Sequence, residues 1–90
     1  MIVDWEKDAE AVLDWIWDWS DWLDSGETII TSVMTVSAGL VLDSSSNSTT
    51  TATAWLSGGT AGNPYSVANR ITTSVGRIDE RTITVRVTNR

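Results

Sequence analysis

The stretch Glu80-Arg81-Thr82-Ile83-Thr84-Val85-Arg86-Val87-Thr88 is the most regular part of the chain. Ile83, Val85 and Val87 alternate in it with Thr and Arg. Successive side chains of a strand point to opposite faces, so a period of two predicts a β-strand with one buried face. This stretch therefore indicates that the chain builds its core from strands rather than helices.

Weaker alternation recurs on the N-terminal side of this stretch. The predicted strands cover residues 29–36, 40–42, 50–57 and 65–74. The side chains that share one face in these runs are Ile30, Ser32, Met34 and Val36, then Ala52, Ala54 and Leu56, then Tyr65, Val67, Asn69 and Ile71. Segments 58–64 and 75–79 predict turns, and the Ser- and Thr-rich segment 43–51 predicts a loop. Short strands at this spacing are typical of an all-β sandwich.

The acidic segment before residue 20 is compatible with two kinds of secondary structure. At a period of two, Trp15, Trp17 and Trp19 share one face. At a period of 3.6, a helical stripe forms instead, with the acids opposite. We favour a strand over about 12–19 followed by a helical turn through Ser20–Asp24, because a strand keeps all three indoles on one surface.

The composition limits the chain to one domain and excludes several function classes. Ninety residues, 9.8 kDa, provide one core. The sequence has no Cys and no His, so we expect no disulfide, no common zinc site and no Ser-His or Cys-His catalytic pair. A net charge of −6 argues against binding to a nucleic-acid backbone. We expect no cofactor, no metal, no catalytic residue and no enzyme activity.

Three motif-like segments have a simpler structural explanation. Asp43, Ser45 and Asn47 have the spacing that opens an EF-hand loop, but the required Gly and the final Glu are missing. The glycine-rich segment 58–62 carries no Lys and precedes no helical pattern, which argues against a phosphate loop. Acid pairs such as Asp14 and Asp18 lack a substrate cleft in a domain of this size, so solvated acids are the better interpretation.

Charge is distributed unevenly along the chain. Residues 1–27 hold nine acids against one Lys, whereas residues 28–90 hold three acids against five Arg. Such an arrangement favours complementary faces that pair within one molecule or between molecules, although the acids also solubilise a Trp-rich segment. The N-terminus lacks a secretory signal, and no segment is apolar enough to span a bilayer, so we expect no membrane association.

The first 22 residues contain five of the six tryptophans. Trp and Arg dominate the energetic centres of protein interfaces, and five indoles exceed what one small core encloses. We therefore predict an interface with another subunit, formed by Trp5, Trp15, Trp17, Trp19, Trp22, Arg77 and Arg81. In one alternative, Trp15, Trp19 and Trp55 fill the core while Trp5 and Trp17 lie on the surface. In another, the Trp row stacks on sugar rings, as in a carbohydrate- or surface-binding module.

Six segments in order resemble a known family. They are Asp-Ala-Glu-Ala-Val-Leu-Asp-Trp (8–15), Asp-Trp-Ser-Asp-Trp-Leu (18–23), Thr-Val-Ser-Ala-Gly-Leu (35–40), Ala-Trp-Leu-Ser-Gly-Gly-Thr-Ala-Gly (54–62), Tyr-Ser-Val-Ala-Asn-Arg-Ile-Thr-Thr (65–73) and Gly-Arg-Ile-Asp-Glu-Arg-Thr-Ile-Thr-Val-Arg-Val (76–87). Over about residues 7–88 the chain resembles small virion proteins of tailed bacteriophages, described as fiber-tail adaptor or head–tail region proteins. The segment 15–17 is richer in Trp than in these relatives, which suggests a local contact role for Trp17.

The resemblance implies a fold, a role and a set of partners. It implies a single immunoglobulin-like antiparallel β-sandwich, which we assign to residues 12–90. Residues 1–11 are short of apolar partners, so we expect them to form an N-terminal arm that reaches a neighbour. The resemblance also implies a non-enzymatic structural protein of the virion, assembled in the host cytoplasm. Its partners would be portal, connector, tail or fibre subunits, and it would form a homo-oligomer in the particle.

Overall fold

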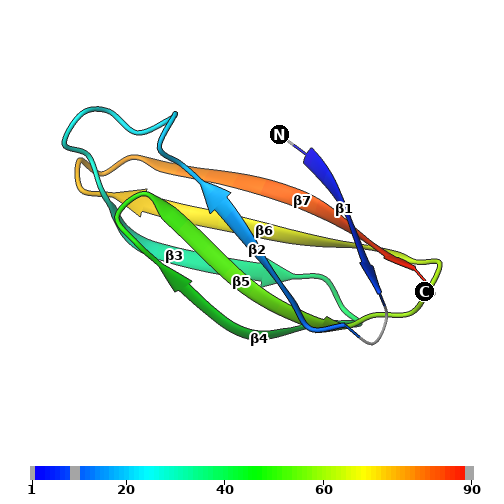
Figure 1. Ribbon diagram of the computed structural model, residues 1–90. Coiled ribbons are helices and arrows are strands. Elements are labelled where there is room, and N and C mark those ends of the chain that lie inside the picture. Colours follow the sequence, from blue (N-terminus) through cyan, green and yellow to red (C-terminus); the bar gives the residue numbers. More distant parts are fainter. Residues whose placement is uncertain (1, 9–10, 89–90) are drawn as a thin grey trace.

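The computed structural model describes residues 2–8 and 11–88, and side chains from 11 to 87. The described residues form seven strands and no helix. The strands are β1 (Ile2–Asp8), β2 (Leu13–Asp18), β3 (Ile29–Val36), β4 (Leu40–Asn47), β5 (Thr51–Gly58), β6 (Pro64–Thr73) and β7 (Ile78–Thr88). They build a four-stranded sheet in the order β1-β7-β6-β3 and a three-stranded sheet in the order β2-β5-β4. The two sheets lie face to face (Figure 1), so the predicted all-β sandwich is confirmed.

The strand order follows that of immunoglobulin domains for six of the seven strands. Numbered along the chain, the second, fifth and fourth strands share one sheet, and the third, sixth and seventh share the other, as do strands B, E, D and C, F, G. The first strand differs from the constant-type arrangement, because β1 lies beside β7. This pairing is parallel, whereas all other strand pairs described are antiparallel. The sandwich is therefore antiparallel, as expected, with one parallel strand added at this edge.

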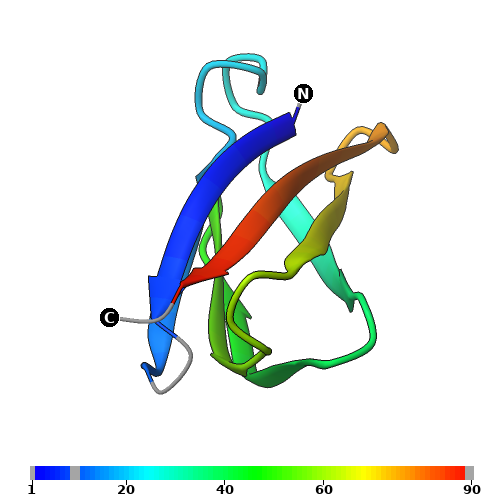
Figure 2. The same cartoon turned by 90° about the vertical axis from the view of Figure 1, so that its right-hand side faces the viewer.

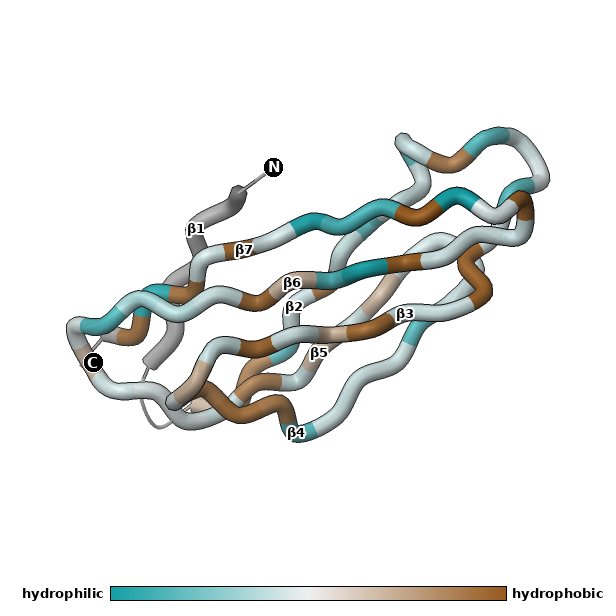
Figure 3. The backbone as a smooth tube through the Cα atoms, turned by 180° about the vertical axis from the view of Figure 1, so that it is seen from behind, coloured by the Kyte–Doolittle hydropathy of each residue, from teal (hydrophilic) through white to brown (hydrophobic). Residues whose placement is uncertain are grey.

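The core lies between the inner faces of the two sheets. Along β6 and β7, hydrophobic positions alternate with more hydrophilic ones (Figure 3). The buried apolar side chains are Trp17, Trp19, Ile29, Leu40, Ala52, Ala54, Leu56, Val67, Ile71, Ile83, Val85 and Val87. In the register of β2 with β5, Trp15 and Trp17 lie opposite Ala54 and Ala52. The small alanines leave room for the large indoles, which is how a thin sandwich reaches close packing.

The N-terminal half of the chain confirms one prediction and corrects another. Residues 13–18 form a strand, and a single turn follows, in which Trp22 and Leu23 donate their amides to the carbonyl of Trp19. The strand interpretation of this segment is therefore confirmed over the helical one. The loop predicted at 43–51 is wrong, because β4 continues to Asn47 and a tight turn at 48–50 leads into β5. Pairing with β5 supplies the hydrogen bonds that stabilise a Ser-rich strand of low intrinsic propensity.

The predicted inner face of β3 is correct except at its start. Ser32, Met34 and Val36 turn inward, but Ile30 is 60% exposed and Ile29 is buried instead. The pairing with β6 shifts register between Ile29 and Thr31. An extra residue in one strand reverses the side-chain alternation beyond it, and a pattern of period two does not reveal such a bulge.

The segment predicted as an N-terminal arm contains β1. Residues 2–8 pair with residues 82–88 of β7, from Ile2 beside Thr82 to Asp8 beside Thr88. β1 is an edge strand with one neighbour in its sheet. Its backbone thus completes the four-stranded sheet of its own chain (Figure 2).

Among the glycines, Gly59 has the least room for a side chain. Its φ is +89°, and a Cβ added there would lie 2.6 Å from Cγ2 of the buried Val87. We expect Gly59→Ala to lower the free energy of unfolding by about 2–3 kcal/mol, through the left-handed backbone and the overpacking together. Gly62 has a similar φ of +90° but no atom within 4 Å of an added Cβ. Gly62→Ala is therefore the control, with a loss of about 1 kcal/mol in urea denaturation; equal losses would contradict the packing argument.

Candidate functional site

One end of the sandwich carries most of the residues that the sequence singled out. The loop between β2 and β3 and the turn between β6 and β7 lie side by side there (Figure 1). The two segments are joined by main-chain contacts, since Ser74 donates its amide to the carbonyl of Thr28 and the amide of Thr28 bonds to the Ser74 hydroxyl. This end is therefore a defined structure rather than two independent loops.

Trp19 connects this end to the core. Its side chain is fully buried, and its Nε1 donates a 2.9 Å hydrogen bond to Oδ1 of Asn69 on β6. The Asn69 amide in turn donates to the Ser32 hydroxyl on β3 at 2.8 Å. A buried polar group is tolerated where it is hydrogen-bonded. These contacts therefore link Trp19, the residue after β2, to β6 and through it to β3.

Two arginines lie over the aromatic rings of this end. Trp22 packs edge-on against Trp19, with ring centroids 5.5 Å apart. The Arg77 guanidinium lies 4.0 Å from the Trp22 ring centroid, and the Arg81 guanidinium 4.2 Å from that of Trp19. Arg81 also donates to the carbonyl of Asp18. Both distances are within the range of cation–π attraction, so each arginine has an aromatic partner within its own chain.

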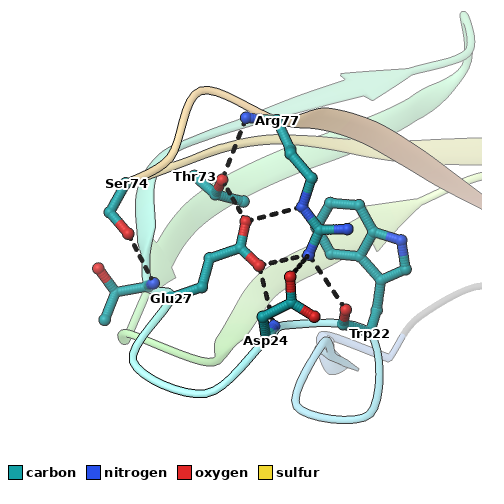
Figure 4. Close-up of polar contacts among 7 residues, drawn as sticks. Trp22, Asp24, Glu27, Thr73, Ser74 and Arg77 are labelled. Atoms are coloured by element: carbon teal, nitrogen blue, oxygen red, sulfur yellow. Dashed lines mark hydrogen bonds and ion pairs between the residues drawn. The ribbon is translucent and has the colours of Figure 1, made fainter.

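Glu27 is a buried carboxylate at the centre of the same end, 5% exposed (Figure 4). It accepts hydrogen bonds from Nε and Nη2 of Arg77, from the Thr73 hydroxyl at 2.6 Å and from the amide of Asp24 at 2.9 Å. The hydrogen bonds from Arg77 are the main reason why the pKa of Glu27 falls to about 2. Glu27 in turn raises the pKa of Arg77. The pair stays ionised at neutral pH, so it is suited to holding the loop rather than to transferring protons.

The predicted interface residues differ in how far the fold covers them. Trp17 and Trp19 are 4% and 0% exposed, because the inner faces of both sheets cover their rings. They are core residues, so their rings are covered within this chain. Trp15 and Trp22 are half-buried against the core, and Arg77 and Arg81 are also half-buried. Trp5 lies in β1, and its side chain is outside the described part.

Sequence reasoning missed an apolar patch on the outer face of the three-stranded sheet. Val12, Ile16, Val41 and Trp55 are 56%, 55%, 49% and 43% exposed, and we call them the Trp55 patch. The alternative that placed Trp55 in the core is wrong. Its own strand contained the signal, because alternation from residue 50 to 57 places Trp55 with the threonines, opposite Ala54 and Leu56. Sequence reasoning also missed Glu27, whose partner lies 50 residues away.

Three hollows in the described surface are small. They have volumes of about 130, 200 and 300 Å³, at or below the lower end of typical ligand pockets, roughly 300–1,000 Å³. The smallest lies between β2 and β7 and is lined in part by Trp15, Trp17 and Arg81. None of the described residues forms a group of three or more Asp or Glu that would hold a metal ion. Within the described ranges, no helix is long and apolar enough to cross a membrane.

Comparison with known proteins provides the family. No curated protein matches this chain closely enough to count as a relative. The model of one protein family, described as podophage GP4 fiber-tail adaptor protein gp77, matches residues 7–86. The match covers nearly the whole chain, including all but the last residue, Val87, of the six segments that resemble phage virion proteins. The chain therefore belongs to the podophage GP4 fiber-tail adaptor protein gp77 family.

Proposed function

We propose that the chain is a non-enzymatic structural part of a podophage virion, where it joins the tail fibre to the tail by binding neighbouring virion proteins. The family match over residues 7–86 carries this proposal. The geometry agrees with it, because the ionisable cluster around Glu27 is used to hold the fold and the described hollows are small. The protein acts by binding alone, and its surfaces set its register against its neighbours.

Two regions are available for these contacts. At the end of the sandwich, Trp22 and Arg77 remain half-exposed, with Trp15 and Arg81 nearby. The N-terminal arm, residues 1–11 with Trp5, is the second region, and its strand β1 lies at the edge of the four-stranded sheet. As an edge strand with one neighbour, β1 is held less firmly than an inner strand and is able to meet another subunit. We propose that several copies surround the tail axis, where repeated weak contacts add avidity.

The experiment is to make phage particles with and without the gene for this chain. We expect quantitative mass spectrometry to find the chain in purified wild-type particles, in a constant ratio to the other tail proteins. We expect particles made without it to keep their heads and lose their fibres in electron micrographs. Absence of the chain from purified particles, or normal fibres without it, would refute the adaptor function.

The carbohydrate-binding alternative is not favoured by any contact described. Trp17 and Trp19 lie inside the core, so the expected row of indoles is not presented to a sugar. A titration of the intrinsic Trp fluorescence with polysaccharide is therefore expected to leave the spectrum unchanged.

A further inference from the structure

The Trp55 patch has the layout of an interface centre. Trp55 lies on β5 between Asp14 on β2 and Ser44 on β4. Ile16 pairs with Thr53 and Val41 pairs with Ser57, so both are diagonal neighbours of Trp55. Diagonal neighbours are within reach of an aromatic side chain. Trp is one of the residue types that dominate the energetic hot spots of interfaces. An exposed apolar patch with a polar rim, here of Ser, Thr and Asp, is typical of an interaction site.

The other sheet offers no equivalent patch among its described side chains. The exposed aliphatic residues on its strands are Ile30 and Val33 on β3 and Ile78 on β7, and β3 and β7 are two strands apart. Between them lies β6, whose outward positions there are Arg70, opposite Val33, and Thr72, opposite Ile78. The apolar side chains of that face are therefore divided by polar ones, which makes the Trp55 patch specific to one side of the sandwich.

The charges around the patch indicate the chemistry of its partner. The sequence contains no Lys and no Arg from residue 8 to residue 69, so the whole three-stranded sheet lacks a cation. Two exposed acids flank the patch: Asp14 lies opposite Trp55, and Asp43 accepts a 3.0 Å hydrogen bond from the Ser57 hydroxyl. A partner that covers this face must supply positive charge to be complementary.

A second copy of the chain is poorly equipped to supply that charge. Two of its arginines already have partners within their own chain. Arg77 binds Glu27 and lies over Trp22, and Arg81 lies over Trp19. Arg70 lies directly opposite Glu80 on the neighbouring strand. The same face of a second copy would also set acid against acid, and each copy carries a net charge of −6. A different protein is therefore the better source of the basic side chains.

We propose that the Trp55 patch docks a different virion protein, which inserts an apolar side chain flanked by Lys or Arg. This inference rests on the proposed adaptor function and adds the surface and the chemistry of its partner. Trp55 and Ile16 bury the apolar side chain, and Asp14 and Asp43 pair with the flanking cations.

The test uses a photocrosslinker in assembled particles. Ile16 is replaced by p-benzoylphenylalanine, Val33 carries the same group in a control, and the crosslinked peptides are sequenced by mass spectrometry. We expect position 16 to crosslink to another virion protein, in a segment with an apolar residue and Lys or Arg within a few positions. Adding Trp55→Ala is expected to reduce the yield by about tenfold or more. Trp55 is partly exposed, so this variant should stay folded, with only a small fall in melting temperature.

Substitutions of the two acids test the charge complementarity separately. Asp14→Asn with Asp43→Asn is expected to lower the crosslinking yield several-fold and to weaken its dependence on salt. Glu80→Gln, which removes an exposed acid from the other sheet, is the matched control and should change nothing.

Several outcomes would overturn the inference. Crosslinks from position 16 to a second copy of this chain, to a glycan, or to a segment without Lys or Arg would each refute the proposed partner. Crosslinks from Val33 but none from position 16 would refute the patch. In each of these results the chain is still present in purified particles, whereas its absence from them would refute the adaptor function itself.

Discussion

Trp19→Ala is expected to lower the free energy of unfolding by about 3–5 kcal/mol, the usual cost of deleting a large aromatic side chain from a core. The indole is fully buried, so its loss leaves a cavity between the sheets. It also removes the hydrogen bond to Asn69 and the ring on which Trp22 and Arg81 pack. The total free energy of unfolding of a small domain is about 5–15 kcal/mol, so this substitution removes a large part of the stability.

Urea denaturation followed by circular dichroism measures this effect without relying on the deleted fluorophore. Trp55→Ala is the matched control, because that ring is 43% exposed and should cost about 1 kcal/mol or less. Trp19→Phe separates the contribution of core packing from that of the hydrogen bond, since it keeps an aromatic ring and removes the donor to Asn69. Similar losses for Trp19→Ala and Trp55→Ala would contradict the assignment of Trp19 to the core.

Acid is expected to destabilise the protein between about pH 4.5 and pH 2. These limits are the pKa values of Glu27 in the unfolded and in the folded chain. The pKa of Glu27 is lowered from 4.5 to about 2 on folding, mainly by Arg77. A carboxyl whose pKa falls on folding contributes its full stabilisation above its unfolded pKa and loses it as pH falls through its folded pKa. The fold is therefore expected to weaken as the pH drops through this window.

The variants Glu27→Gln and Glu80→Gln isolate this contribution. We expect Glu27→Gln to lower the urea midpoint at pH 7, because the Arg77 guanidinium then lacks its carboxylate partner. At pH 2 the difference from wild type should be much smaller. Glu80 is an exposed acid on β7, and Glu80→Gln should leave the pH profile nearly unchanged. A wild-type midpoint that stays constant from pH 5 to pH 2 would contradict the role of Glu27.

Local sequence patterns predicted the strands well where burial alternates cleanly. Val67, Asn69 and Ile71 on β6 and Ile83, Val85 and Val87 on β7 all face inward as their period of two requires. The pattern was less informative at Ile30 and over residues 43–47, where a bulge and a hairpin partner decided the outcome. Register shifts depend on the neighbouring strand, so a single strand's sequence does not contain them.

The candidate site depended more strongly on tertiary structure. The sequence alone determined that the chain is one small β domain without His or Cys, acidic at its start and rich in Trp. It did not determine which indoles are covered, because residues of one type are equally apolar whether they face a core or a partner. Packing of the sheets decided that Trp19 is enclosed and that Trp55 is partly exposed. Folding also decided that Arg77 binds Glu27, since 50 residues separate them along the chain and only the meeting of two loops brings their charges together.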